Sequence, residues 1–102
     1  IEQPCPAGQE HAIDDVHPIP LCADESFDTV EDFATLSTIY TMVNVKLDKC
    51  GGPTAALRIA AEAKRRGIGL MAGSMLTTSL GIAPLFLLAG HARWFDIDAP
   101  TY

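Results

Sequence analysis

Basic residues are scarce in this sequence, which has 7 Lys and Arg against 13 Asp and Glu over 102 residues and a formal net charge of −6. A nucleic-acid-binding protein needs a basic face to neutralise phosphates, so we expect no nucleic-acid partner. The one basic cluster, KRR at 64–66, falls where a helix is expected to end, and cations there complement the helix dipole.

Cysteine pairs and long apolar runs are also lacking. The three cysteines form no CxxC pair and the three histidines lie far apart, so neither a disulfide framework nor a zinc site is expected. An odd number of thiols favours a reducing compartment. The apolar run GIAPLFLLAG (81–90) is too short to span a bilayer, and the N-terminal IEQPCP has no signal-peptide character. We therefore expect a cytoplasmic protein with no membrane partner.

Apolar segments alternate with helical segments along the chain. Strands are expected at 20–23, 40–47, 68–75 and 94–98, and helices at about 29–37, 51–67 and 80–90, with a clipped helix at 10–16. This alternation predicts a parallel sheet, either doubly wound or closed into a (β/α)₈ barrel. A complete barrel needs about 250 residues. We therefore expect residues 1–102 to be part of a larger protein, as a true fragment or as an incomplete sequence.

The segment 51–67 has the clearest helix signals. Pro53 and Thr54 suit its start, and Gly67 suits its end. Arg58 and Glu62 are four residues apart, a spacing that predicts an ion pair on the helix surface.

Ionisable residues stand where several expected strands end. These residues are Glu2 after Ile1, Asp24 and Glu25 after 20–23, Lys46 after 42–45, and Asp96 and Asp98 after 94–95. In barrel enzymes the catalytic groups come from the carboxyl ends of several different strands. Four strand ends that each carry an ionisable group therefore predict a functional site.

Strand alternation separates the two lysines of VNVKLDKCGG (43–52). Successive side chains point to opposite faces, which groups the polar residues against the apolar ones: Asn44, Lys46 and Asp48 against Val43, Val45 and Leu47. If the valines pack against outer helices, Lys46 points into the mouth of the barrel. Lys49 then lies beyond the strand, as a neighbouring charge. By the same alternation Asp96 and Asp98 share a face.

Each of these residues also has a simpler interpretation. A lone lysine at a strand end can be merely solvated, Asp24 or Ser26 could cap the following helix, and 96–98 could be a surface turn before Pro100. Agreement among four strands favours a site instead. Carboxylates from adjacent strands suit Mg²⁺, and a lysine beside them can act as a general base.

Five motifs, taken in order, resemble successive strand ends of the enolase superfamily: IEQP (1–4), ADES (23–26), VNVKLDKCGG (43–52), GLMAGSMLTTSLG (69–81) and FDIDAP (95–100). More narrowly, they resemble the muconate-lactonizing subgroup and its dipeptide epimerases of the L-Ala-D/L-Glu type. The resemblance covers nearly the whole chain, although DES or GG alone would be a weak signal. It implies an α/β fold, the C-terminal portion (about strands four to eight) of a (β/α)₈ barrel. The N-terminal capping domain and the first barrel strands are absent from residues 1–102.

The same resemblance implies a role for each residue. Glu2 and Asp24 would be two of three Mg²⁺ ligands, Lys46 the base, and Asp96 and Asp98 the partners of the substrate's α-ammonium group. The implied reaction is 1,1-proton transfer at the α-carbon of a dipeptide, through an enediolate, with Mg²⁺ as cofactor. The second lysine (from a KxK motif) and the third metal ligand lie outside this sequence, so the isolated 102 residues should be inactive and bind Mg²⁺ poorly.

Two other interpretations remain open. The first is another enzyme of the subgroup, such as an N-acylamino acid racemase or a muconate cycloisomerase-like enzyme. The second is a non-catalytic partial barrel that assembles with a copy of itself or with a complementary half-barrel. A homo-oligomeric parent would be unsurprising in this superfamily.

Overall fold

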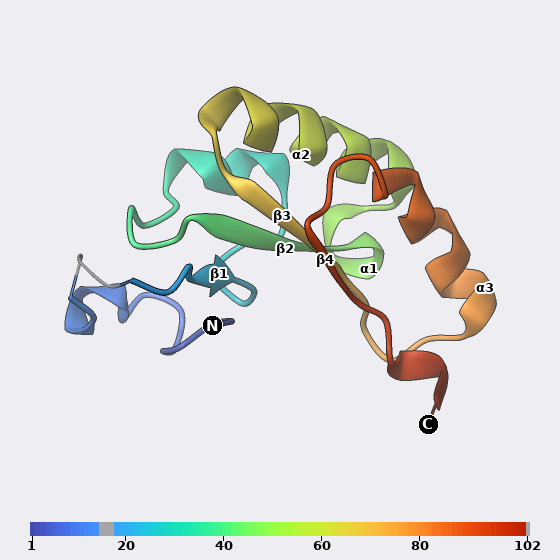
Figure 1. The fold of residues 1–102 in the computed structure, drawn as a ribbon, viewed down its shortest axis with the longest axis horizontal. Coiled ribbons are helices and arrows are strands. Elements are labelled where there is room, and N and C mark those ends of the chain that lie inside the picture. Colours follow the sequence, from blue (N-terminus) through green and yellow to red (C-terminus); the bar gives the residue numbers. More distant parts are fainter. Residues whose placement is uncertain (15–17, 102) are drawn as a thin grey trace.

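Four short strands form a fully parallel sheet in chain order: β1 Cys22–Ala23, β2 Met42–Lys46, β3 Gly69–Gly73 and β4 Trp94–Asp96. The computed structural model describes residues 1–14 and 18–101 (Figure 1). Glu2 adds a fifth parallel segment through a single bridge to Cys22. Five successive parallel segments match the prediction of about strands four to eight of a barrel.

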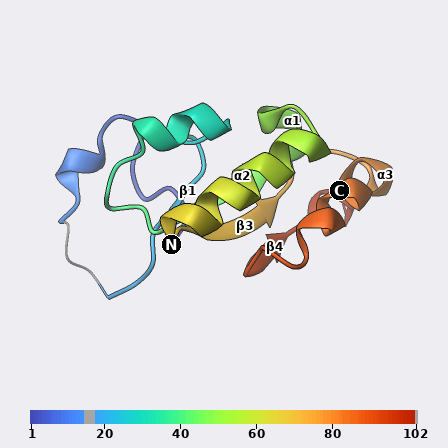
Figure 2. The same ribbon diagram turned by 90° about the horizontal axis from the view of Figure 1, so that it is seen from above.

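Helical segments connect the strands, with η marking a 3₁₀-helix: η1 Glu10–Ala12, η2 Val30–Ala34, α1 Leu47–Cys50, α2 Pro53–Arg66, α3 Ser79–Ile82, η3 Ala83–Leu88 and η4 Ala99–Thr101. Seen from above, α2 lies across β3 (Figure 2). Within the described residues, no helix has both the length and the apolar character needed to cross a bilayer.

The sheet buries one face against α2 and leaves its polar residues on the other. Val43 and Val45 of β2 lie in one buried cluster with Ile59 of α2. The residues that alternate with them, Asn44 and Lys46, point to the opposite face, where Lys46 lines a cleft. The predicted alternation along this strand is therefore confirmed.

Helix α2 begins and ends as the sequence predicts. Pro53 occupies the first turn, and Gly67 closes the helix with φ 72°, a left-handed conformation that favours glycine. The predicted Arg58–Glu62 pair is wrong. Glu62 instead accepts hydrogen bonds from Arg65 Nε at 2.8 Å and Arg66 Nε at 2.5 Å, so its partners follow it by three and four residues.

Two predicted helices are shorter or less regular than expected. The helix expected at 29–37 is the single 3₁₀ segment η2, and the one at 80–90 divides into α3 and η3. Pro84 lies at the start of η3 and has no N–H to continue an α-helical ladder, which explains the division. Of the helix expected at 10–16, only η1 is seen, and residues 15–17 lie outside the described part.

Three of the four predicted strands also end earlier than expected. Lys46 is the last residue of β2, because Leu47 starts α1, a helix that the sequence did not predict; Asp48 is therefore not on the strand face of Lys46. At the other end of the chain, pairing stops at Gly73–Asp96 because β3 itself stops there. Asp98 therefore lies outside β4, and strand alternation does not place it on the same face as Asp96.

Candidate functional site

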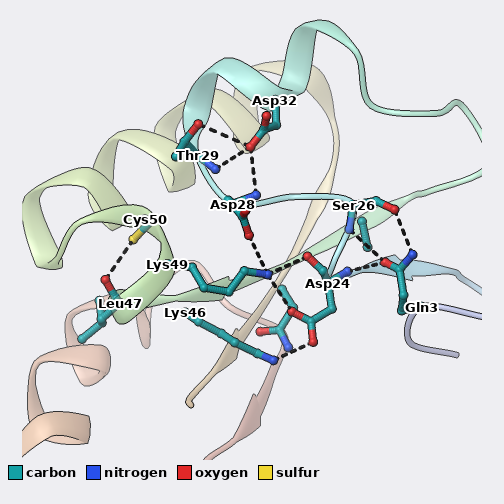
Figure 3. Close-up of polar contacts among 12 residues, drawn as sticks. Gln3, Asp24, Ser26, Asp28, Thr29, Asp32, Lys46, Leu47, Lys49 and Cys50 are labelled. Atoms are coloured by element: carbon teal, nitrogen blue, oxygen red, sulfur yellow. Dashed lines mark hydrogen bonds and ion pairs between the residues drawn. The ribbon is translucent and has the colours of Figure 1, made fainter. Parts of the chain in front are cut away.

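Asp24 follows β1 and is bonded by two lysines (Figure 3). Lys46 Nζ lies 2.6 Å from Oδ2, and Lys49 Nζ lies 3.0 Å from Oδ1 and 2.7 Å from the carbonyl oxygen of Asp24. The residue is only 7% exposed. Burial alone would raise the pKa of the Asp24 carboxyl, but the hydrogen bonds from Lys46 and Lys49 outweigh it and hold that pKa below its ordinary value. The alternative of a helix cap is wrong, because Thr29 caps η2.

Lys49 is a counter-ion in this arrangement. Besides Asp24 it contacts Asp28, with Nζ 2.8 Å from Oδ1. Partial burial lowers the pKa of Lys49, but the bonds to Asp28 and Asp24 outweigh that and raise it above its ordinary value. Lys49 therefore lies beyond the strand as a charge beside Asp24, the position that the sequence predicts for it.

Glu2 is the second carboxylate and has a neutral partner. The Nδ2 of Asn44 donates to its Oε1 at 2.6 Å. Partial burial raises the pKa of Glu2, the Asn44 bond lowers it, and the nearby Asp24 charge raises it further, so the net pKa is raised. The two carboxylates are therefore close enough to repel each other. A cation between them would relieve that repulsion.

A cleft of about 800 Å³ opens at the carboxyl ends of the strands. Glu2, Asp24, Lys46 and Asp96 are among the residues that line it. The fold thus brings together four of the five residues to which the sequence analysis assigned a role in the site. Asp98 lies beyond the end of β4 and is exposed.

The residues present fit Mg²⁺ by their chemistry but do not complete a site. Glu2 and Asp24 offer hard oxygen donors, which Mg²⁺ prefers. Within residues 1–14 and 18–101, however, no group of three His, Cys, Asp or Glu side chains converges on one point that could hold a metal. Any further protein ligands would have to come from outside the described residues.

The cysteines are ordinary thiols. All three are free, and Cys22 and Cys50 are buried whereas Cys5 is partly exposed. Burial, reinforced by the nearby Glu2 charge, raises the pKa of Cys22 to about 12. A raised pKa in a buried position is typical of a structural thiol and not of a nucleophile.

Two residues of the site, Gln3 and Asn44, were not given a role by the sequence. Asn44 is 1% exposed, and its Oδ1 has no hydrogen-bond partner among the described residues. An amide between two buried valines was the available signal, because such a polar residue needs a partner. Gln3 offered no local signal, since its partners lie far along the chain.

Gly73 leaves the space that Asn44 occupies. A methyl group at Gly73 would overlap the Asn44 amide, lying 2.7 Å from Nδ2 and 3.0 Å from Cγ. Gly73 is paired with Lys46 on the neighbouring strand, so this contact lies directly beside the cleft. The absence of a side chain here is what allows Asn44 to reach Glu2.

Gly73→Ala should therefore push Asn44 away from Glu2 and lower the free energy of unfolding by about 1–3 kcal/mol, as overpacking does. Gly90→Ala is the matched control, because nothing lies within 4 Å of its added methyl group and its φ is not positive. It should change the free energy of unfolding by less than about 1 kcal/mol. Urea denaturation of both variants makes the comparison, and equal stability would show that the cleft side of β3 tolerates a side chain.

Comparison with known proteins assigns the chain to a family. The model described as Enolase C-terminal domain-like matches residues 1–97. Over 101 residues the chain is 50% identical to the N-acetyl-D-glutamate racemase of Pseudoalteromonas sp. (98% of this chain, 32% of the relative). Over 103 residues it is 45% identical to the L-Ala-D/L-Glu epimerase of Escherichia coli K12 (100% and 32%). The chain thus spans about a third of the length of the curated relatives it matches.

The chain also matches solved structures of similar proteins. An enolase family member from Agrobacterium tumefaciens with homology to dipeptide epimerases, bound to sodium and L-Ala-L-Glu, matches with a TM-score of 0.88 at 48% identity, over 98% of this chain and 31% of that one. A dipeptide epimerase from Methylococcus capsulatus, complexed with Mg and L-Arg-D-Lys, matches with a TM-score of 0.86 at 34% identity, over 98% and 31%.

Proposed function

From the premise that the chain belongs to the enolase C-terminal domain-like family, we propose that it forms the C-terminal part of the barrel of a Mg²⁺-dependent dipeptide epimerase. The observation that carries this proposal is the cleft shared by Glu2, Asp24, Lys46 and Asp96. The reaction would be removal and return of the proton on the α-carbon of a dipeptide's C-terminal residue. Named relatives that are epimerases and racemases support an isomerase of this kind.

Each residue of the cleft has a defined part in the proposal. Lys46 would move the α-proton on one face of the substrate, while Lys49 keeps its charge beside Asp24. Glu2 and Asp24 would hold Mg²⁺, which supplies positive charge to stabilise the negative charge that develops on the substrate. Asp96 ends β4 and faces the same cleft, where its carboxylate suits a substrate ammonium group. Asp98 would assist from just beyond the strand.

Other parts of the enzyme would come from outside residues 1–102. We propose that these parts are the opposing lysine, a third metal carboxylate and a domain that covers the cleft. The free thiols support a cytoplasmic location.

The isolated 102 residues should therefore not epimerise L-Ala-L-Glu and should bind Mg²⁺ only weakly, because two carboxylates and one lysine are too few. Calorimetric titration with Mg²⁺ and a chiral assay of the dipeptide check both expectations. Epimerisation by these residues alone would refute the proposal that the active site needs residues from outside 1–102.

A second candidate substrate is an N-acetylated amino acid. The 50% identity to a relative named N-acetyl-D-glutamate racemase favours it. An N-acetyl group carries no positive charge, however, so it offers Asp96 no ammonium group to pair with. A cycloisomerase substrate would lack that charge as well. The carboxylate of Asp96 in the cleft is why we place the dipeptide first.

Proton exchange in D₂O tests the proposed reaction in the complete protein. With Mg²⁺ and L-Ala-L-Glu, the Glu α-proton signal in ¹H NMR should disappear as the D-Glu diastereomer forms. Lys46→Met should slow formation of the D-Glu diastereomer roughly 100- to 10,000-fold, the usual contribution of a general base. Lys64→Met, at the exposed end of α2, should leave that rate unchanged. Undiminished epimerisation by Lys46→Met would remove Lys46 from the reaction.

Asp96→Asn separates the two substrates. It should slow turnover of L-Ala-L-Glu roughly 10- to 100-fold, since a charge-assisted hydrogen bond is worth about 1.5–3 kcal/mol. Turnover of N-acetyl-L-glutamate, if present, should not fall in the same variant. The ratio of kcat/KM for the two substrates is the measurement, and an equal loss for both would count against an ammonium-binding role.

A further inference from the structure

The side-chain amide of Gln3 is bonded through both of its polar atoms. Its Oε1 accepts hydrogen bonds from the backbone N–H groups of Asp24 at 2.9 Å and Ser26 at 3.2 Å (Figure 3). Its Nε2 lies within hydrogen-bond distance of three acceptors: the Cys5 carbonyl at 2.8 Å, Ser26 Oγ at 2.8 Å and Tyr40 Oη at 3.0 Å. An amide nitrogen has two hydrogens, so these three acceptors share them.

The backbone of Gln3 adopts a conformation that glutamine rarely takes. Its φ is 33°, and among the described residues it is the one non-glycine residue with positive φ. Its N–H still donates to the Cys22 carbonyl at 2.8 Å, which continues the pairing of Glu2 with β1. A backbone held in such a conformation needs surrounding contacts that stabilise it, and such residues are common at functional sites. The hydrogen bonds of the Gln3 side-chain amide are contacts of this kind.

The bonds of Gln3 act on the turn that carries Asp24. That turn is closed by a bond from the Phe27 N–H to the Asp24 carbonyl at 3.0 Å, and Phe27 is 1% exposed. Lys46 and Lys49 hold the Asp24 carboxylate, and Lys49 also bonds the Asp24 carbonyl oxygen at 2.7 Å. Gln3 differs from them because it accepts from two backbone N–H groups of the turn, those of Asp24 and Ser26.

The partners of Gln3 are themselves anchored. Tyr40 is 3% exposed and belongs to the buried core cluster. Ser26 Oγ donates to Glu10 Oε1 at 2.5 Å, and Tyr40 Oη lies 3.5 Å from the same oxygen. The Gln3 amide therefore connects the cleft to the core through groups that cannot move freely.

We infer that Gln3 is a positioning residue that holds Glu2, its chain neighbour, and Asp24 in one fixed arrangement, and so sets the affinity of this carboxylate pair for Mg²⁺. The metal part of this inference rests on the proposed function. Gln3 touches neither the substrate nor the metal in this account. It acts through the turn at 24–26.

The test compares Mg²⁺ binding by Gln3→Met with that of the unaltered complete protein, by isothermal titration calorimetry without substrate. Methionine keeps the length of the side chain and removes all five hydrogen bonds. The Mg²⁺ dissociation constant should rise about 10- to 100-fold, as is usual when the residues that orient metal ligands are lost. A dissociation constant equal to that of the unaltered protein would overturn the inference, even if the protein epimerises dipeptides.

Arg66→Ala is the matched control for loss of stability. It removes the bond from Arg66 Nη1 to the Phe33 carbonyl at 2.9 Å, which ties α2 to η2 away from the cleft. Its Tm should fall while its Mg²⁺ affinity stays within about twofold of the unaltered protein. An equal loss of Mg²⁺ affinity in both variants would show that the effect of Gln3→Met comes from a general loss of stability. That result would overturn the inference.

Two further outcomes are decided in advance. If Gln3→Met does not fold, Gln3→Asn takes its place: it keeps a neutral amide but is one methylene shorter, which should break the bonds to the Asp24 and Ser26 N–H groups, so weaker Mg²⁺ binding would support the inference whereas unchanged binding would overturn it. If the unaltered protein binds no Mg²⁺, the proposed function fails. The crystal structure of Gln3→Met then decides the positioning role, because a displaced 24–26 turn would support it and an unmoved turn would overturn it.

Discussion

Side-chain alternation along β2, within a sheet whose strands all run in one direction, is the constraint on which the site depends. Val43 and Val45 are committed to the core beneath α2, so Asn44 and Lys46 lie on the opposite face, where Lys46 lines the cleft. Parallel pairing brings the carboxyl ends of neighbouring strands to one edge, and residues from both ends of the chain meet there. A slip of one residue in β2 would bury the Lys46 ammonium group in the apolar core, which makes this register strongly favoured.

The electrostatics of the cleft follow from which partner each carboxylate has. Asp24 receives two ammonium groups, and its pKa is lowered despite its burial. Partial burial raises the pKa of Glu2, and the charge of Asp24 adds to that rise against the hydrogen bond from the neutral amide of Asn44. Positive charge placed between the two carboxylates would offset their repulsion. In the proposed metal site, the residues that hold the turn and the strand end would orient both carboxylates.

The sequence predicted the parallel order, the buried face of β2, and four residues that meet in one cleft, because periodicity and strand-end position are local properties. It did not predict α1, the early end of β4, or the partners of Glu62, which depend on where a neighbouring strand stops and how side chains compete. Gln3 and Asn44 were missed for a related reason. Gln3 bonds Tyr40 across 37 positions and Asn44 bonds Glu2 across 42, and no local pattern reveals such contacts.

The central claim is that Glu2 and Asp24 form part of one cation site in front of Lys46. The most direct test is a crystal structure of the complete protein grown with Mn²⁺ in place of Mg²⁺, with anomalous scattering used to locate the ion. The account predicts an anomalous peak in the cleft with carboxylate oxygens of both Glu2 and Asp24 as ligands. The account would be contradicted by an anomalous peak elsewhere in the protein. It would also be contradicted if Asp24, at saturating Mn²⁺, contacts only Lys46 and Lys49.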